Sequence, residues 1–550
     1  MVDFSAETNR ETPGALLVHK RPRMSANSNQ HRDKNQKHAT RIHPPRGGRL
    51  WLLVALCAAA VYLPTMAPGL LWGDSGDAQI RVLRGELRDP ALLARTHVTY
   101  YAVAIALRDT VGLNPALAAN LVSALAGIVT VANVGWLISL FVRRRTPIAC
   151  GVALLLLSHT LWQLSTGAEV VTFSTMCLSL ELVMVVKFAR TRRLRWLALI
   201  GLVNGIGWST HNFALLIWPA YALMAAMRWG AFPKPYARSL VLVAGMWVLG
   251  SLPLIVLTIL DYRQGGDASV TIRSLLVGWY GPRVFNTNVT PRLILQQIAY
   301  VAYNFPTPLI LLAIFGWWRI RSDQGRGIWW FLTVSGVVYF VFAARYRVPD
   351  QYTFLIHGYV FLILFAAVGI DHWLGRFRSK AMWASVVLLS LVAPLVYSRA
   401  PGLARRFADG SSVRPTRAIP YRDLLQWFLT PWRTGYDGAE RYARETFEML
   451  PPDALLIAGS TTRRPLDYLQ GHEDLRKDVR MPLLNFRLAS PDDLNGGFTA
   501  ANALIERRLL FCTSNVRPYT PKWLVEAGYT FEPINHVYRV NMPKSSVADR

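Results

Sequence analysis

Apolar residues in this chain are gathered into long, nearly uninterrupted runs rather than spaced with the period of a soluble amphipathic helix. Several runs reach the roughly 20 residues that an α-helix needs to cross the hydrocarbon core of a bilayer. We expect about eleven membrane-spanning helices, near residues 50–70, 114–142, 147–165, 168–188, 195–209, 211–227, 239–260, 294–318, 327–344, 353–370 and 381–397. The pattern predicts an all-α polytopic membrane protein.

The pattern changes at both ends of this apolar region. Residues 1–48 are polar and basic without an apolar period, which predicts a disordered cytoplasmic tail. Near the other end, the short apolar runs 454–458 and 509–512 each follow a helix-like stretch, an order typical of a small α/β domain. We therefore expect the tail, a membrane domain at 49–397 with its first outer loop at 71–96, and an extracytoplasmic α/β domain at 398–550.

The formal net charge of +27 comes from Lys and Arg residues, many of which lie between the predicted spans. If the basic tail is cytoplasmic, the connections on its side of the membrane hold 17 Lys or Arg against 2 acids, whereas the opposite connections hold 10 against 8. This asymmetry follows the positive-inside rule. The charge therefore indicates topology in the cytoplasmic (inner) membrane, with lipid contacts and no nucleic-acid partner.

Most of the specialised polar residues fall on the predicted outer side. Two carboxylates, Asp74 and Asp77, lie in a tight glycine-flanked turn directly after the first span. Further polar residues lie at other span ends on the same side: His97, Glu169, His211, Asn212, Arg345, Arg347, Asp350, Gln351 and Tyr352. This gathering on one face indicates a site at the outer surface of the membrane.

Each of these residues has a structural and a functional interpretation. An aspartate of the turn could cap a helix that begins near Ala78, or it could take a proton from an acceptor hydroxyl or bind a divalent metal that does so. Arg345 and Arg347 could anchor a span end, or bind a phosphate or pyrophosphate through the guanidinium fork. The histidines and the asparagine suit the membrane interface, but as a set they could also hydrogen-bond sugar hydroxyls.

Within the predicted spans, Glu181 is the most unusual residue. An acid near the middle of the membrane costs about 2.5 to 3.5 kcal/mol on insertion scales. Glu181 must therefore face protein or water, and Asn204 and His159 are its candidate partners. This acid keeps open an alternative function, a transporter of lipid-linked oligosaccharides.

Six stretches of the chain match the motifs of a known family in the same order. They are the turn Asp74-Ser75-Gly76-Asp77, His97 with Tyr100 or Tyr101, Glu169-Val170, the glycine-rich run ending in His211-Asn212, the segment from Tyr346 to Tyr352, and Tyr468-Leu469-Gln470 with Arg476-Lys477-Asp478-Val479. In these motifs the chain resembles the GT-C membrane glycosyltransferases, specifically the domain of unknown function 2723 family with its transmembrane-protein-260 type O-mannosyltransferases. The resemblance extends from about residue 50 to 485.

One motif departs from the family pattern. Typical members carry a His-Pro-Pro-Gly-Tyr-Pro run, whereas this chain has His97-Val98-Thr99-Tyr100, and the gap from Asp74 to His97 is several residues longer. The departure puts the geometry of the first loop, and so the substrate, in doubt.

The resemblance implies a GT-C fold and an inverting hexosyltransferase that moves a sugar, with mannose expected, from polyprenyl phosphate to a protein or glycan hydroxyl. It implies Asp74 as the base or metal ligand with Asp77 as its partner, and Arg345 or Arg347 at the donor phosphate. The expected substrate-binding residues are His97, Tyr100, Glu169, His211, Asn212, Asp350, Gln351 and Tyr352. No cofactor is certain, and a divalent metal remains open.

Overall fold

The computed structural model describes residues 47–89, 91–228, 236–377, 379–408, 418–482, 497–516 and 519–543. Apart from its last two residues, which begin the first described helix, the tail expected at 1–48 lies outside this part of the chain.

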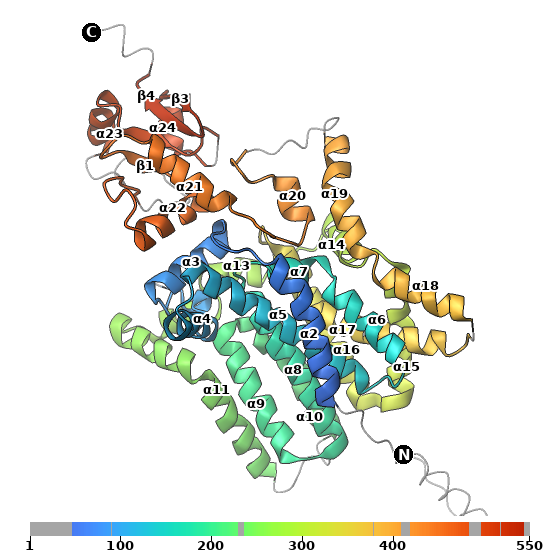
Figure 1. Ribbon diagram of the computed structural model, residues 1–550. Coiled ribbons are helices and arrows are strands. Elements are labelled where there is room, and N and C mark those ends of the chain that lie inside the picture. Colours follow the sequence, from blue (N-terminus) through green and yellow to red (C-terminus); the bar gives the residue numbers. More distant parts are fainter. Residues whose placement is uncertain are drawn as a thin grey trace, which may run out of the picture. The chain divides into compact units, whose positions relative to one another are not determined.

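Six helical segments within the described ranges are long and apolar enough to cross a membrane. They are α2 (Gly47–Thr65), α5 (Pro115–Ser139), α8 (Val170–Thr191), α11 (Tyr236–Gly265), α16 (Arg326–Arg345), and η6 (Gln351–Leu355) continued by α17 (Ile356–Leu374). Of these, α5, α8 and the η6–α17 segment are the most buried within the bundle (Figure 1). The chain is therefore a multi-pass membrane protein.

Two further segments are bent pairs of helices, which bring the number of candidate spans to as many as eight. The pair α14 (Pro291–Asn304) and η5 (Pro308–Leu312) with α15 (Ala313–Gln324) is bent by 112°, and α18 (Lys380–Ser390) with α19 (Ala393–Ala408) by 47°. The sharper bend lies at Pro306 and Pro308, and proline breaks a helix because it lacks a backbone N–H.

The other expected spans fall on shorter helices, namely α6 (Arg145–Leu156) with α7 (His159–Leu164), α9 (Leu194–Thr210), and η2 (Asn212–Ile217) with α10 (Trp218–Arg228). All eleven predicted segments are thus helical in the structure. How many of them cross the membrane stays a prediction.

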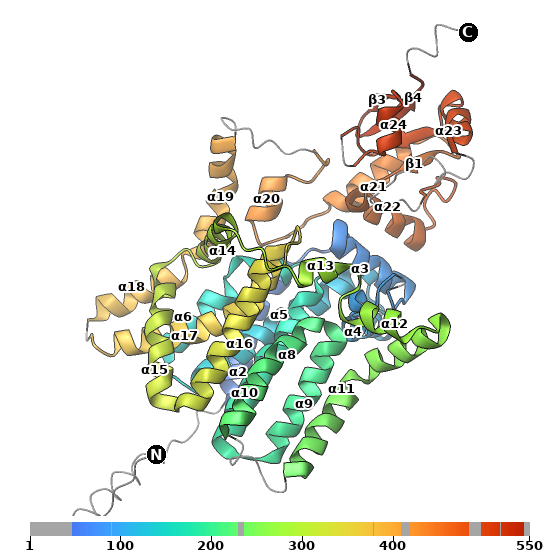
Figure 2. The same ribbon diagram turned by 180° about the vertical axis from the view of Figure 1, so that it is seen from behind.

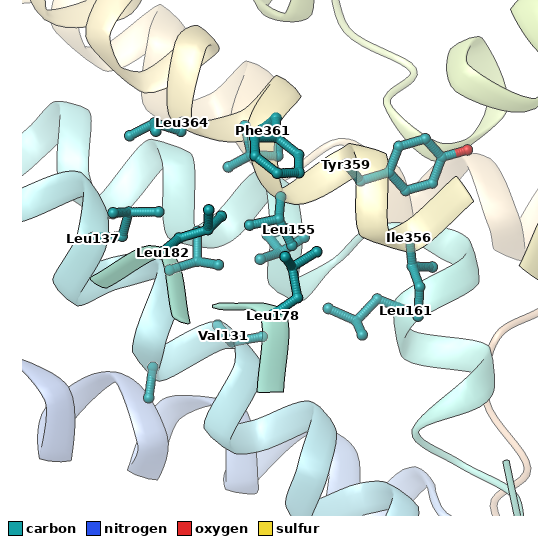
Figure 3. Packing of buried hydrophobic residues seen from close by; sticks show 14 of the residues in the cluster. Val131, Leu137, Leu155, Leu161, Leu178, Leu182, Ile356, Tyr359, Phe361 and Leu364 are labelled. Atoms are coloured by element: carbon teal, nitrogen blue, oxygen red, sulfur yellow. The ribbon is translucent and has the colours of Figure 1, made fainter. Parts of the chain in front are cut away.

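The interior of the bundle is packed with aliphatic and aromatic side chains. Figure 3 shows residues of one buried cluster, contributed by α5, α6, α7, α8 and α17: Val131, Leu137, Leu155, Leu161, Leu178, Leu182, Ile356, Tyr359, Phe361 and Leu364. Elsewhere small residues bring backbones together, because a Cβ atom added to Gly205 of α9 would lie 2.2 Å from the carbonyl oxygen of Trp247 on α11. Such glycine contacts are common between membrane helices.

The first outer loop forms α3 (Gly73–Arg84), η1 (Leu93–Arg95) and α4 (Val98–Val111). Its sequence suggests an amphipathic helix lying on the membrane surface, but Ile80 of α3 packs into an apolar cluster with the C-terminal region. On another side of α3, the buried Gln79 donates a hydrogen bond to Asn120 of α5 (3.0 Å). Both contacts fix α3 against protein.

A second outer connection packs against the first. It forms α12 (Ala268–Leu276), η4 (Gly278–Tyr280) and α13 (Gly281–Val284). The backbone N–H of Leu93 donates to Ser274 Oγ (3.0 Å), and Arg88 pairs with Asp261. These contacts hold the two loops together as one layer.

The C-terminal region contains helices and a four-stranded mixed sheet (Figure 2). Its elements are α20 (Leu424–Leu429), α21 (Gly438–Met449), β1 (Leu455–Ile457), α22 (Ser460–His472), α23 (Gly497–Glu506), β2 (Leu510–Cys512), α24 (Lys522–Glu526), β3 (Thr530–Ile534) and β4 (Val537–Asn541). The strand order is β1-β2-β4-β3; β1 and β2 are parallel and the other neighbours antiparallel. The predicted α/β fold of this region is confirmed, whereas the division of the chain into three domains stays a prediction.

Candidate active site

A cavity of about 390 Å³ lies beside the first outer loop. It is also lined by the start of α8, the segment after α9, the second outer connection and the segment between α16 and α17. Seven of the predicted site residues line it: Asp74, Asp77, His97, Glu169, His211, Asn212 and Asp350. Segments far apart in the sequence therefore meet at one site.

Two other cavities formed by the described residues contain none of the predicted site residues. One, of about 460 Å³ beside α9, α10 and α11, is lined almost entirely by apolar side chains. The other, of about 710 Å³, lies along residues 418–436. The chemistry of the lining, rather than the size, therefore identifies the cavity beside the first loop as the candidate active site.

The two aspartates lie inside a helix rather than in front of one. Helix α3 begins at Gly73, whose φ of 60° favours glycine, and the residue before it, Trp72, makes no side-chain capping bond. The alternative of an aspartate capping a helix near Ala78 is therefore wrong. Because residues three apart share one face of a helix, Asp74 and Asp77 both line the cavity.

The two carboxylates have different partners. Asp77 Oδ1 pairs with Arg464 Nη2 at 2.8 Å, and Asp77 Oδ2 lies 3.5 Å from Arg95 Nη2. Asp74 is exposed in the cavity and forms no hydrogen bond or ion pair with any residue the structure describes. Asp74 is thus the carboxylate that remains free to meet a substrate.

Three carboxyl groups at the cavity have a raised pKa, and burial is the largest cause for each. The pKa of Asp74 is raised because the surrounding protein removes water, although Arg95 opposes the shift. Burial and the charge of Asp74 raise the pKa of Asp350 to about 6. The pKa of Glu169, which directly precedes α8, is raised to about 8 by burial and by both aspartates. At neutral pH Glu169 therefore keeps its proton and can donate a hydrogen bond.

The first loop also supplies two arginines that the sequence analysis missed. Arg81 is buried, donates to the carbonyl oxygens of Arg95 (2.9 Å) and Thr96 (3.0 Å), and lies over the ring of Tyr101. Arg81 therefore braces the turn that carries Arg95, which lines the cavity as a cation beside Asp77. In the sequence Arg81 belongs to the polar face of an amphipathic segment and Arg95 lies beyond it, so no local signal distinguished either arginine.

Two stacked histidines line the cavity as neutral rings with opposite hydrogen-bonding roles. Nδ1 of His97 lies 2.6 Å from the carbonyl oxygen of Thr210, which only accepts, so the free Nε2 of His97 is an acceptor. Nδ1 of His211 accepts from the N–H of Phe213 (3.2 Å), which places the ring proton on Nε2. Burial lowers the pKa of His97 well below its usual value and that of His211 to about 4. The pair can thus bind a hydroxyl pair as acceptor and donor.

Both predicted phosphate-binding arginines lie outside the cavity lining. Arg345 Nη1 donates to the carbonyl oxygen of Asn286 (3.1 Å), and Arg347 Nη2 donates to that of Asn288 (2.9 Å). In this arrangement they hold the second outer connection, and only Arg95 and Arg81 among the cavity-lining residues are cationic at neutral pH. Their predicted role at the donor phosphate remains untested.

Three predicted substrate-binding residues also lie outside the lining and bond within the protein. Tyr100 donates to the carbonyl oxygen of Ala119 (2.8 Å). Gln351 donates to the carbonyl oxygens at the end of α16 (2.8 and 2.9 Å), and Tyr352 donates to Gln163 Oε1 (3.0 Å). These bonds support the walls of the site rather than its surface.

No group of three or more His, Cys, Asp or Glu side chains in the described ranges is arranged to hold a metal ion. The carboxyl groups of the cavity therefore do not fit a metal centre built from the protein alone.

The helical bundle is similar in fold to solved membrane proteins. ArnT from Cupriavidus metallidurans, solved with undecaprenyl phosphate, superposes with a TM-score of 0.55 over 90% of this chain and 98% of its own, at 12% identity. Its apo form gives the same TM-score and identity over 89% and 97%. The Archaeoglobus fulgidus oligosaccharyltransferase gives a TM-score of 0.47 at 12% identity, over 91% of this chain and 75% of its own. The likeness to the two ArnT structures shows that the chain has the GT-C glycosyltransferase fold.

The sequence itself gives the narrower relationship. Residues 98–231 match the family model described as the protein O-mannosyl-transferase TMEM260 N-terminal domain. No curated protein matches the chain. The resemblance to GT-C glycosyltransferases of this family is therefore confirmed.

Proposed function

We propose that this protein transfers a sugar, with mannose expected, from a polyprenyl-phosphate donor to a hydroxyl of a protein or glycan acceptor. The observation that carries the proposal is the free carboxyl of Asp74 in a cavity whose other polar groups suit sugar hydroxyls and a phosphate. ArnT, which shares the fold, is solved with undecaprenyl phosphate, and this supports the donor class. The positive-inside pattern supports a reaction at the outer face of the cytoplasmic membrane.

In the proposed reaction Asp74 accepts the proton of the acceptor hydroxyl. The acceptor oxygen forms a bond to the anomeric carbon as the bond from that carbon to the phosphate oxygen breaks. The polyprenyl phosphate leaves with the electron pair, and one such displacement inverts the anomeric centre. General-base catalysis of this kind contributes about 10² to 10⁴ in rate.

Asp77 and the cations of the first loop complete the proposed mechanism. Asp77 is held by two arginines, so we assign it to support of Asp74 rather than to proton transfer. Because Arg95 lines the cavity, we assign it to stabilisation of the negative charge that develops on the departing phosphate. For Arg345 or Arg347 to share this role, each would have to leave a backbone carbonyl.

The remaining lining residues suit the sugar itself. The neutral histidine pair offers one acceptor and one donor nitrogen, and the protonated Glu169 offers a further donor. We assign Asn212 to support of the wall, because it donates to the carbonyl oxygens of Leu275 (2.9 Å) and Leu276 (3.0 Å).

The transporter alternative rested on Glu181, for which the structure gives a structural explanation. Glu181 is buried and accepts a hydrogen bond from Tyr221 (2.8 Å). Asn204 also bonds to it, whereas the ring of His159, the other predicted partner, packs at a tilt against Tyr303 and edge-to-face against Tyr397. Since Glu181 has its own partners, it does not require a transported ligand.

The test is replacement of the proposed base. Asp74→Asn should lower transfer from polyprenyl-phosphate mannose by about 10² to 10⁴ in purified, reconstituted protein. Asp109→Asn is the matched control, because Asp109 is an exposed acid of α4 paired with Arg108. Unchanged transfer by folded Asp74→Asn protein would refute the assigned role.

A second measurement identifies the transferred sugar and its acceptor. Mass spectrometry of glycoproteins and surface glycans from cells with and without the gene would reveal which sugar is missing and where. Loss of a single mannose from one glycan would support the proposal. Loss of a different sugar would overturn the donor assignment while keeping the reaction class.

A further inference from the structure

One cation at the candidate site comes from the C-terminal region rather than from the membrane domain. Arg464 lies on α22, and its Nη2 is 2.8 Å from Oδ1 of Asp77 on α3. The side chains are 30% and 18% exposed, so the pair is shielded more than an ordinary surface ion pair. The Asp77 carboxylate is thus shared between Arg95 of its own loop and Arg464 from a distant part of the chain.

The two helices approach too closely for this pairing to be incidental. A Cβ atom added to Gly76 would lie 2.7 Å from Cβ of Arg464 and 2.7 Å from the carbonyl oxygen of Leu71. The absence of a side chain at this position of α3 therefore makes room for Arg464.

An apolar cluster also stabilises the contact between α3 and α22. It joins residues that flank the acidic turn with residues of the C-terminal region: Leu70, Trp72, Ile80, Tyr442, Leu466, Tyr468 and Leu469. Trp72, which directly precedes α3, also donates a hydrogen bond to the Tyr436 hydroxyl. Apolar, polar and ionic contacts therefore all join the start of α3 to the C-terminal region.

This arrangement fixes which carboxylate faces the substrate. With Arg464 at one oxygen and Arg95 near the other, Asp77 is held in place, and the helical turn that links it to Asp74 is held with it. Asp74 then enters the cavity without a partner of its own. Without Arg464, Asp77 would lose the closer of its two ion pairs, and the first turn of α3 would lose this anchor.

We propose that Arg464 is a positioning residue for the transfer reaction: it anchors Asp77 so that the first turn of α3 presents Asp74 to the cavity. This inference rests on the proposed function of Asp74. It makes the C-terminal region part of the active site, although no described residue of that region lines the cavity.

A double-mutant cycle tests the coupling. Arg464→Gln should lower kcat about tenfold with little change in KM for the donor, because the base is displaced rather than the donor site lost. If Arg464 acts through Asp77, the double variant with Asp77→Asn should be no slower than the slower single variant. Multiplying effects would overturn the proposal. Arg464→Lys, which keeps the charge, should restore part of the rate.

The neighbouring arginine provides a matched control. Arg463 on the same helix pairs with Asp467 (2.9 Å) and donates to the carbonyl oxygen of Met481 (3.0 Å), all within the C-terminal region. If Arg464 is needed only for folding of this region, Arg463→Gln should lower transfer as much as Arg464→Gln. Equal losses would therefore count against positioning, and thermal unfolding of both variants would show whether either is misfolded.

A labelling experiment separates this inference from the proposed function. Asp74→Cys is placed in a Cys57→Ser background, since the other native cysteines are buried, and is labelled with a membrane-impermeant maleimide. Adding Arg464→Gln should raise the labelling rate about fivefold by loosening the turn, whereas Arg463→Gln should not. An unchanged rate overturns positioning. A raised rate together with full transfer by Asp74→Asn would support positioning and refute the role of Asp74.

Discussion

The proton held by Glu169 makes the stability of this protein depend on pH in a defined direction. Burial and the nearby aspartates raise the pKa of Glu169 from 4.5 to about 8, so the folded state binds this proton more tightly than the unfolded state. The resulting stabilisation is fully present below pH 4.5 and is lost as the pH rises through 8. Glu169→Gln, which cannot ionise but can still accept from Ser75, should remove this dependence.

The size of this stabilisation follows from the shift in the pKa of Glu169. At about 1.36 kcal/mol per pKa unit, the full displacement corresponds to roughly 5 kcal/mol. Because Glu169 is only partly buried in the fold and borders the cavity, water offsets part of this, and we expect about 2 to 3 kcal/mol. For a chain of this length, that corresponds to about 2 °C in the unfolding temperature.

Thermal unfolding in detergent, followed by tryptophan fluorescence at pH 5 and pH 9, measures the effect. Other groups titrate in this range, so the quantity that matters is the pH 5 to pH 9 difference of the wild type minus that of Glu169→Gln. Glu86→Gln is the control, because Glu86 is a half-buried acid of the same loop paired with Arg84. Equal differences for the wild type and Glu169→Gln would mean that Glu169 ionises freely, and its proposed role as a hydrogen-bond donor would fail.

Three further predictions concern single residues at the cavity and within the bundle. Asp350→Asn removes a negative charge coupled to Asp74 and should move the acid limb of the kcat/KM profile to lower pH. Arg95→Gln removes a cation that lowers the pKa of Asp74 and should move the same limb to higher pH; coincident limbs would contradict the electrostatics described above. Tyr221→Phe removes the hydroxyl that donates to Glu181 and should cost about 1 to 3 kcal/mol of stability, measured by thermal unfolding. The KM for the donor should stay unchanged, and a changed KM would reopen a ligand role for Glu181.

The sequence could predict the helical bundle and much of the site because both depend on local signals. Hydrophobic runs of membrane length locate the helices, and the charge of their connections places the polar residues on one face. Asp74, Glu169 and Asp350 each lie next to the end of a predicted span, and the structure brings them to one cavity. The predicted order of the spans already places these three residues on the same side of the membrane.

Contacts over long distances in the sequence could not be predicted in the same way. Arg464 follows the last predicted span, and nothing near it in the sequence indicates a partner on α3. Arg345 was predicted to bind phosphate from its residue type and its predicted side of the membrane. In the structure its guanidinium instead donates to a backbone carbonyl of the second outer connection, a contact that the sequence does not indicate. The pattern of apolar and polar residues along a helix shows which side is buried, but not which residue an arginine side chain contacts.

The hairpin of β3 and β4 was missed for a different reason. Thr530–Ile534 and Val537–Asn541 are short, and their residues are mostly half-buried or exposed, so they lack a continuous apolar run. A signal was nevertheless present in the turn, where Asn535 adopts a φ of 55°. Asparagine is favoured at such left-handed positions of a tight hairpin.

The contacts between the C-terminal region and the acidic turn also determine when, during synthesis of the chain, the site becomes complete. A ribosome makes Asp74 and Asp77 early and Arg464 only after all the predicted spans. A nascent or truncated chain that ends before α22 therefore has the carboxylates but not the contact that orders them. Catalytic competence would arrive late in biosynthesis, which would prevent unfinished chains from consuming the lipid-linked donor.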